Sequence, residues 1–270
     1  TCWIGSRCLT VSSNMANELD EIREPLLHQA AGIAQETPVD IESIARHFGV
    51  VEIEPRAIEI DGYLARRPDG GLAIRHRNDC APTRIRFTVA HEVGHIMIAR
   101  QLGRDLNTPV ARSNFRDDAE ERLANRIASE LLMPEKIIHK HLVSENVEWR
   151  TIGKLANELQ VSLESLIFRL TELKWLSFLE LSQASSGEVG GSPNVRVRAI
   201  GWKGRLCFET KPTELFAKLS AEMGESVNCS QHQLTVWEAN RPRCLQIIGR
   251  RRTVQERRLV QFLSWRVRES

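Results

Sequence analysis

A helical run that carries polar residues at fixed intervals constrains this chain more than any other feature. Residues 84–100 read RIRFTVAHEVGHIMIAR, in which apolar, helix-favouring residues surround His91, Glu92 and His95. Burying an imidazole or a carboxylate without a partner costs on the order of a few kcal/mol, so these groups need a ligand or a hydrogen-bond partner. Gly94, which lies between them, would let another segment of the chain approach the helix closely.

The spacing of the two histidines indicates a metal ion. His91 and His95 are four residues apart, which places both on one face of an α-helix with converging side chains. This is the H-E-x-x-H arrangement, in which two imidazoles bind Zn²⁺ and the glutamate, here Glu92, is the general base for the metal-bound water. The alternative is a core helix with two hydrogen-bonded histidines, because a five-residue match also arises by chance.

A second helix offers the third ligand that a catalytic zinc site usually has. Residues 117–134 read DDAEERLANRIASELLMP, with apolar residues at helical spacing and Pro134 where a helix should end. Glu121 is the predicted third ligand, and Asn125 is predicted to hold a ligating histidine by its other ring nitrogen. Glu120 is the alternative ligand. Acidic residues in a first helical turn are also ordinary partners of the helix dipole.

These motifs resemble those of a known family. RFTVAHEVGH, the ExxAN motif from Glu121 to Asn125, ASELLMP, and TPVDIESIARHFGV at residues 37–50 follow the order found in the ImmA/IrrE family of bacterial metallopeptidases. The resemblance covers residues 30–180 and implies a zincin-like fold. It also implies site-specific cleavage of a helix-turn-helix transcriptional repressor, which would activate a response to radiation and DNA damage. The spacing of the residues alone does not indicate that substrate.

The composition is that of an ordinary globular protein. The 270 residues suffice for one large domain or two ordinary ones, and the formal net charge is +2 with both signs interspersed. The six cysteines form no C-x-x-C pair, which argues against a zinc knuckle or a disulfide framework and suits a reducing cytoplasm. No apolar run approaches the roughly 20 residues that span a bilayer, so we expect no membrane association.

We expect an α+β fold whose zincin-like peptidase domain occupies residues 16–145. Residues 1–15 are predicted to be disordered or an extended start, because Met15 opens an amphipathic stretch that is typical of a first folded element. Alternating apolar residues at 50–86 predict a small antiparallel sheet with a hairpin turn at residues 68–71. A strand beside the metal helix suits a peptidase, because an extended substrate can pair with its edge.

This sheet carries the only tyrosine of the chain, Tyr63. A phenol near the metal would stabilise the oxyanion of a tetrahedral intermediate, although a single tyrosine on a strand is more often a packing residue. Arg86 and His76 are similarly placed and are equally untested candidates. His139 and His141 are two residues apart, which puts them on different faces of a helix, so neither is expected to bind the metal.

Residues 146–181 have the outline of a helix-turn-helix. A short turn at residues 160–162 ends in Ser162, a suitable N-cap for the second helix. The exposed face of that helix offers few Arg, Lys, Asn or Gln side chains to read bases, so direct DNA binding is not expected. A packing or substrate-docking role is preferred.

A second domain is predicted at the C-terminus. Residues 182–194, SQASSGEVGGSPN, predict a linker. Residues 195–270 predict a small α+β domain with several strands and with helices at residues 212–224 and 254–269. In chains of the ImmA/IrrE family this region resembles a GAF-like sensory domain, which implies a small-molecule ligand. The alternative is an inert docking or stabilising domain.

Two functions from different classes follow from these features. The preferred one is a cytoplasmic zinc endopeptidase with a protein substrate, in which His91, His95 and Glu121 hold the ion, and Mn²⁺ or Fe²⁺ are alternatives. The other is a DNA-binding transcription regulator with a structural metal site and a small-molecule-sensing C-terminal domain. A structural zinc is normally enclosed by four protein ligands, and three good ligands with Glu120 beside them favour the enzyme.

Overall fold

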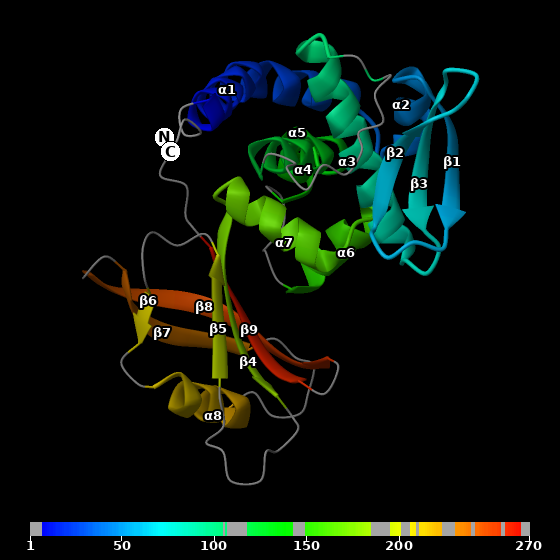
Figure 1. Cartoon of the computed structure of the whole chain (residues 1–270). Helices are drawn as coiled ribbons and strands as arrows, with labels where there is room; N and C mark the ends of the chain where they lie inside the picture. The colour runs from blue at the N-terminus through cyan, green and yellow to red at the C-terminus, as the bar shows by residue number, and fades with distance from the viewer. Residues whose placement is uncertain are drawn as a thin grey trace. The chain divides into compact units, whose positions relative to one another are not determined.

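A computed structural model describes most of the chain, and its elements are labelled in Figure 1. The described residues are 7–104, 106, 118–142, 149–184, 195–200, 206–208, 211–222, 230–238, 241–254 and 257–265. The chain divides into two compact units, which we describe separately. The first comprises residues 1–144 and 155–162, and the second comprises residues 145–154 and 163–270.

Two helices that pack side by side form the centre of the first unit. α3 runs from Pro82 to Gln101 and α4 from Asp118 to Leu132. Between Thr88 and Ile98 every residue of α3 is buried except His91, which is half-buried. A helix that is apolar on most sides is enclosed by other elements, and here α4, α1 (Arg7–Ile33) and the strands β2 and β3 contact it (Figure 1).

The close approach predicted at Gly94 is confirmed, and its partner is α4. A Cβ atom at Gly94 would lie 3.0 Å from the carbonyl oxygen and 3.1 Å from the Cα atom of Ala124. These separations are shorter than the 3.5–4.0 Å or so at which carbon atoms normally pack. The absence of a side chain at this position therefore lets the two helix backbones come together.

The first helix starts earlier than the sequence indicated. α1 begins at Arg7, so most of the start that was predicted to be disordered is helical, while residues 1–6 lie outside the described residues. Residues 7–14 contain neither glycine nor proline, so nothing in them stops the helix that follows. Two shorter helices, α2 (Ile41–His47) and α5 (Glu135–Leu142), also belong to the first unit, and α6 (Trp149–Glu158) is divided between the two units.

A three-stranded sheet lies beside α3. β1 (Val50–Arg56), β2 (Gly62–Arg66) and β3 (Leu72–Arg77) are arranged in the order β1-β3-β2. The β2–β3 hairpin is antiparallel, as predicted, and Gly70 at its turn has a φ of +88°. β1, however, pairs with β3 in parallel, so the prediction of an antiparallel sheet was wrong for this strand. Alternation of apolar residues is the same in both pairings and does not reveal strand direction.

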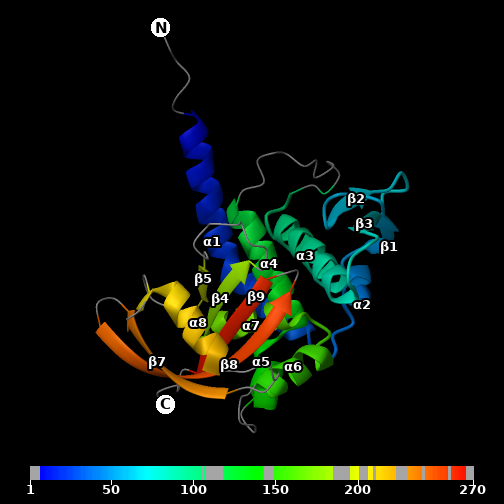
Figure 2. The same cartoon turned by 90° about the horizontal axis from the view of Figure 1, so that it is seen from below.

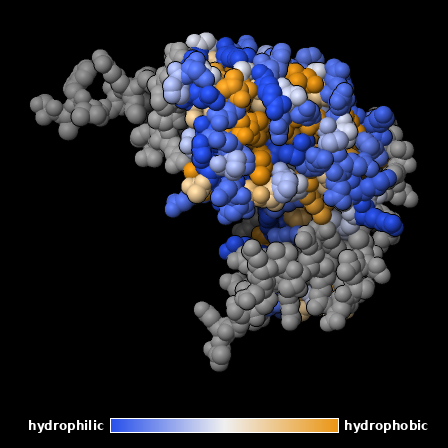
Figure 3. All heavy atoms as spheres, turned by 90° about the vertical axis from the view of Figure 1, so that its right-hand side faces the viewer, coloured by the Kyte–Doolittle hydropathy of each residue, from blue (hydrophilic) through white to orange (hydrophobic). Residues whose placement is uncertain are grey.

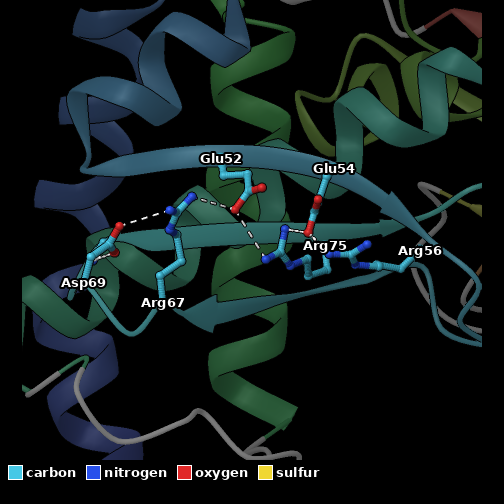
Figure 4. A network of polar contacts seen from close by, with 7 residues as sticks. Glu52, Glu54, Arg56, Arg67, Asp69 and Arg75 are labelled. Atoms are coloured by element: carbon cyan, nitrogen blue, oxygen red, sulfur yellow. Dashed lines mark hydrogen bonds and ion pairs between the residues drawn. The ribbon is translucent and has the colours of Figure 1, made fainter.

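A network of ion pairs covers one face of this sheet (Figure 4). Arg75 on β3 pairs with both Glu52 and Glu54 on β1, and Arg67 at the hairpin turn joins Glu52 to Asp69. Opposite charges on neighbouring strands stabilise a sheet modestly. The side of the molecule that carries β1 to β3 is mostly hydrophilic, with hydrophobic residues between (Figure 3).

The second unit contains an antiparallel sheet of six strands in the order β5-β4-β9-β8-β7-β6. α7 (Leu163–Glu172) contacts β4, and α8 (Pro212–Glu222) lies against the sheet (Figure 2). The strands are β4 (Leu176–Ala184), β5 (Val195–Ile200), β6 (Leu206–Phe208), β7 (Ser230–Glu238), β8 (Arg241–Val254) and β9 (Arg257–Trp265).

Two predictions about this unit were wrong. Residues 254–269 were expected to be helical, but β9 lies within this range and pairs with both β4 and β8. The predicted linker began at Ser182, but β4 continues to Ala184 because Ser182 and Gln183 pair with β5 and β9. Residues 185–194 lie outside the described residues. The mixture of helices and sheets agrees with the α+β class.

α7 corresponds to the second helix of the predicted helix-turn-helix. Its single arginine, Arg169, is only 4% exposed and pairs with Glu172 at 2.9 Å. Leu166, Ile167 and Leu170 are buried as well. This burial agrees with a packing role for α7. Among the helices that the structure describes, none combines the length and apolarity that a bilayer span requires.

Candidate metal centre

α3 and α4 bring three potential metal ligands together. The Nε2 atoms of His91 and His95 are 3.1 Å apart. The carboxylate of Glu121 lies 3.3 Å from His91 Nε2 through one oxygen and 3.4 Å from His95 Nε2 through the other. No other group of three or more His, Cys, Asp or Glu side chains among the described residues converges in this way.

The spacing of these three donors fits a metal ion. Zinc binds imidazole nitrogen and carboxylate oxygen at about 2.0–2.2 Å, so a tetrahedral ion separates its ligand atoms by about 3.3 Å. The two nitrogens are 3.1 Å apart, and each lies 3.3 or 3.4 Å from a different oxygen of Glu121, which is close to that value. Two neutral imidazoles and one carboxylate are also a donor set that suits zinc.

Hydrogen bonds to the other ring nitrogens orient both histidines. His91 Nδ1 lies 3.0 Å from Asn125 Oδ1, and His95 Nδ1 lies 3.2 Å from Glu120 Oε1. An oxygen acceptor at Nδ1 keeps the proton there, which leaves Nε2 with the lone pair that a metal needs. Asn125 therefore occupies the place predicted for it. Glu120, the alternative ligand, contacts Nδ1 of His95, whereas Glu121 faces Nε2 of the same ring.

Glu92 is buried beside the site with an unused acceptor. Its side chain is 2% exposed, and its Oε2 atom has no hydrogen-bond partner among the described residues. A buried carboxylate oxygen without a donor is costly, so such atoms are often found where a ligand or a reacting group completes the bonding. Glu92 follows His91 directly in α3, and its role as general base stays a prediction.

Arg104 is a member of the site that the sequence did not reveal. Its Nη1 atom donates to Glu120 Oε2 at 2.8 Å. The hydrogen bond from His95, followed by the Arg104 guanidinium, holds the pKa of the Glu120 carboxyl below its usual value, although burial acts in the opposite direction. Glu120 is therefore ionised at neutral pH. No residue pattern marks Arg104 in advance, because it lies beyond the end of α3.

β2 runs along the same helix. A Cβ atom at Gly62 would overlap Thr88, which lies on α3 one turn before His91 and Glu92. The preceding residue, Asp61, has a lowered pKa, mainly because Arg84 donates a hydrogen bond to it and to a lesser extent because of His91. β2 is an edge strand, so the edge beyond it faces no other strand of this sheet.

Tyr63 lies on this strand, half-buried and opposite Arg75 in the register with β3. Its role as an oxyanion donor stays a prediction. Arg86 donates to the carbonyl oxygen of Val39 at 2.8 Å, and burial lowers its pKa. It therefore ties α3 to the segment before α2.

Three further histidines that the sequence analysis considered lie outside the cluster of donors. His76 is buried on β3, and its Nδ1 atom faces its neighbour's carbonyl oxygen at 3.0 Å. His139 and His141 lie on α5, where His141 pairs with Glu158 at 3.3 Å. As expected, neither is among the converging ligand atoms.

Comparison with known proteins shows what the segment that carries this site is similar to. Residues 45–171, which include all three donors, match the family model described as IrrE N-terminal-like domain, Peptidase_M78. Just under half of the chain is thus similar to the ImmA/IrrE family. Two curated relatives bear the name "Radiation response metalloprotease IrrE". The one from Deinococcus radiodurans is 33% identical over 34% of this chain and 28% of its own length. The one from Deinococcus deserti is 32% identical over 44% of each.

The chain thus spans less than half the length of the curated relatives it matches. A solved structure titled "Mycobacterium tuberculosis transcriptional regulator" superimposes with a TM-score of 0.54 and covers 95% of this chain and 93% of its own. At 13% identity this likeness concerns the fold alone.

Proposed function

We propose that this chain belongs to the ImmA/IrrE family and that it is a zinc-dependent endopeptidase. The observation that carries the proposal is the convergence of His91, His95 and Glu121 at the separations of a tetrahedral site. A bound zinc ion would lower the pKa of a coordinated water toward roughly 7 and polarise a peptide carbonyl. Mn²⁺ and Fe²⁺ are accepted by the same donors and are alternatives.

Glu92 acts as the general base in this proposal. Its carboxylate takes a proton from the attacking water and later passes it to the leaving amine. The buried acceptor without a partner supports this role, because the group is held in place and its oxygen is not engaged elsewhere. Tyr63 on β2 is the candidate that would stabilise the negative charge on the carbonyl oxygen.

The substrate would bind in extended form along β2. An edge strand presents unpaired backbone N–H and C=O groups, and a peptide can add to it as another strand. The packing of Gly62 on Thr88 brings this edge next to the turn of α3 that carries His91 and Glu92. The backbone of β2 would then position a peptide bond, while its side chains would select sequence.

We further propose that the substrate is a helix-turn-helix transcriptional repressor in the cytoplasm, cleaved during a response to radiation or DNA damage. Support comes from the curated relatives, whose names describe radiation-response metalloproteases. The domain at residues 195–270 would be a GAF-like sensory domain that controls cleavage through a small molecule. The alternative, a DNA-binding regulator with a structural metal site, is not favoured, since three donors rather than four converge among the described residues.

A cleavage assay tests this proposal. Purified, zinc-loaded protein is mixed with a helix-turn-helix repressor from the same organism, and fragments are identified by mass spectrometry. We expect one cut that a chelator prevents. Glu92→Gln should abolish the cut while the zinc content stays at that of the wild type, and Glu59→Gln, on the exposed segment before β2, should cleave normally. Turnover retained by Glu92→Gln would remove the general-base assignment.

A further inference from the structure

Two neighbouring carboxylates at the start of α4, those of Glu120 and Glu121, lie close to the two histidines. Both oxygens of Glu121 face the histidine Nε2 atoms, at 3.3 and 3.4 Å. Both oxygens of Glu120 are engaged elsewhere, one at 3.2 Å from His95 Nδ1 and one at 2.8 Å from Arg104 Nη1. The side chains of Glu120 and Glu121 are 22% and 28% exposed, so burial does not distinguish them.

We propose that Arg104 decides which carboxylate reaches the metal, by holding Glu120 against His95 Nδ1. Glu120 then becomes a positioning residue, because it fixes His95 in the form that presents Nε2. This inference rests on the proposed metal site, but it concerns the selection between two ligands and not the existence of the site.

Electrostatics gives the reason why a selector is needed. A carboxylate next to a divalent cation is strongly attracted to it, and the attraction grows as the surroundings become less polar. Without a competing cation, Glu120 would have little to keep it from adding to the ion as a fourth protein ligand. That addition would occupy the position that a catalytic site keeps open for water. An arginine beside Glu120 offers a charge-assisted hydrogen bond instead.

The end of α3 places Arg104 for this task. Gly103 adopts a φ of +61°, the left-handed conformation in which glycine commonly ends helices. The backbone N–H of Arg104 then donates to the carbonyl oxygen of Ala99 at 2.8 Å. This backbone hydrogen bond fixes the position of Arg104 relative to the end of α3. α3 therefore supplies both histidines, and the turn that ends it supplies the cation that restrains Glu120.

Cobalt substitution provides the test, because tetrahedral Co²⁺ absorbs visible light more strongly than five- or six-coordinate Co²⁺. Arg104→Ala should lower the absorption per bound ion, since Glu120 joins the coordination sphere. The double variant Arg104→Ala/Glu120→Gln should restore it, because an amide is a much weaker ligand. The matched control is Arg122→Ala, which removes an exposed arginine next to Glu121 and should leave the spectrum unchanged.

Zinc affinity, measured by competition with a coloured chelator, gives a second readout that does not depend on activity. Glu120→Ala should weaken zinc binding by about 10- to 100-fold, the usual effect of removing a partner of a ligating histidine. Glu120→Gln keeps an acceptor for His95 Nδ1 and should recover most of that loss.

Three outcomes would overturn the inference. The first is a cobalt spectrum unchanged in Arg104→Ala, and the second is a changed spectrum that the double variant does not restore. In both cases a tetrahedral spectrum of the wild-type protein would leave the proposed metal site standing. The third is a wild-type protein that binds neither cobalt nor zinc, which would remove the metal site itself.

Discussion

Replacing Gly94 by alanine tests the idea that α3 and α4 touch through their backbones. The new methyl group would lie 3.0 and 3.1 Å from backbone atoms of Ala124, which cannot rotate away as a flexible side chain would. Either the two helices separate by a few tenths of an ångström, or the backbone around residues 94 and 124 becomes strained. Overpacking of this kind costs about 1–3 kcal/mol.

A second glycine separates this cost from the general effect of the substitution. Alanine is better than glycine inside a helix by about 0.5–1 kcal/mol. Gly32 in α1 belongs to the same unit, and a Cβ atom there would meet nothing within 4 Å. Gly32→Ala should therefore be neutral or slightly stabilising. The free energy of unfolding of Gly94→Ala should be about 1–3 kcal/mol lower than that of Gly32→Ala.

Urea denaturation of the metal-free proteins, followed by circular dichroism, measures the difference. Since His91 and His95 lie on α3 and Glu121 on α4, separation of the helices should also weaken zinc binding by Gly94→Ala. If Gly94→Ala proves as stable as Gly32→Ala and binds zinc as tightly as the wild type, neither the packing of the two helices nor the metal site depends on this contact.

Three further outcomes are expected. Asp40 caps α2, so Asp40→Ala should lower stability by about 1 kcal/mol in denaturant titrations. The hydrogen bond from the Ser43 hydroxyl, followed by that from the Ser43 backbone N–H, lowers the pKa of Asp40. The capping contribution to stability should therefore be fully present above the unfolded-state pKa of about 3.9. It should disappear as the pH falls through the lower pKa of the folded state. A difference between wild type and Asp40→Ala that persists in acid would contradict this. Asn125→Ala, which frees His91 Nδ1, should reduce zinc affinity about 10- to 100-fold in a chelator competition, and unchanged affinity would remove its orienting role. Gly62→Ala should push β2 away from Thr88 and impair peptide cleavage more than zinc binding, and equal losses would mean that β2 supports the metal site rather than the substrate.

The donor cluster is largely predictable from sequence because it depends on spacing within helices. His91 and His95 are four positions apart in the sequence, as are Glu121 and Asn125, and that interval places both side chains of a pair on the same face of a helix. The choice between Glu120 and Glu121 is harder, because neighbouring residues differ by about 100° around a helix and the packing of α4 on α3 decides between them. The part played by Arg104 depends on how α3 ends in space, for which the sequence has no periodic signal.

The structure of β9, unlike the donor cluster, is not predictable from local sequence. Leu259, Val260, Phe262 and Leu263 suit one face of a helix and also suit a strand that is covered on both sides. What decides is the pairing of β9 with β4, whose residue Glu180 lies opposite Gln261. Local sequence does not contain information about a partner so far away along the chain. The direction of β1 in the first sheet escapes prediction for the same reason.

A metal ion bound by donors from two different helices would act as a removable cross-link. His95 and Glu121 belong to segments that are joined only through the chain between α3 and α4, so their meeting depends on the folded state. An ion that binds the folded form alone raises its stability by about 2.7 kcal/mol when free metal is 100 times the dissociation constant. If the proposed site holds such an ion, the supply of that metal would help to determine how long each molecule persists before proteolysis.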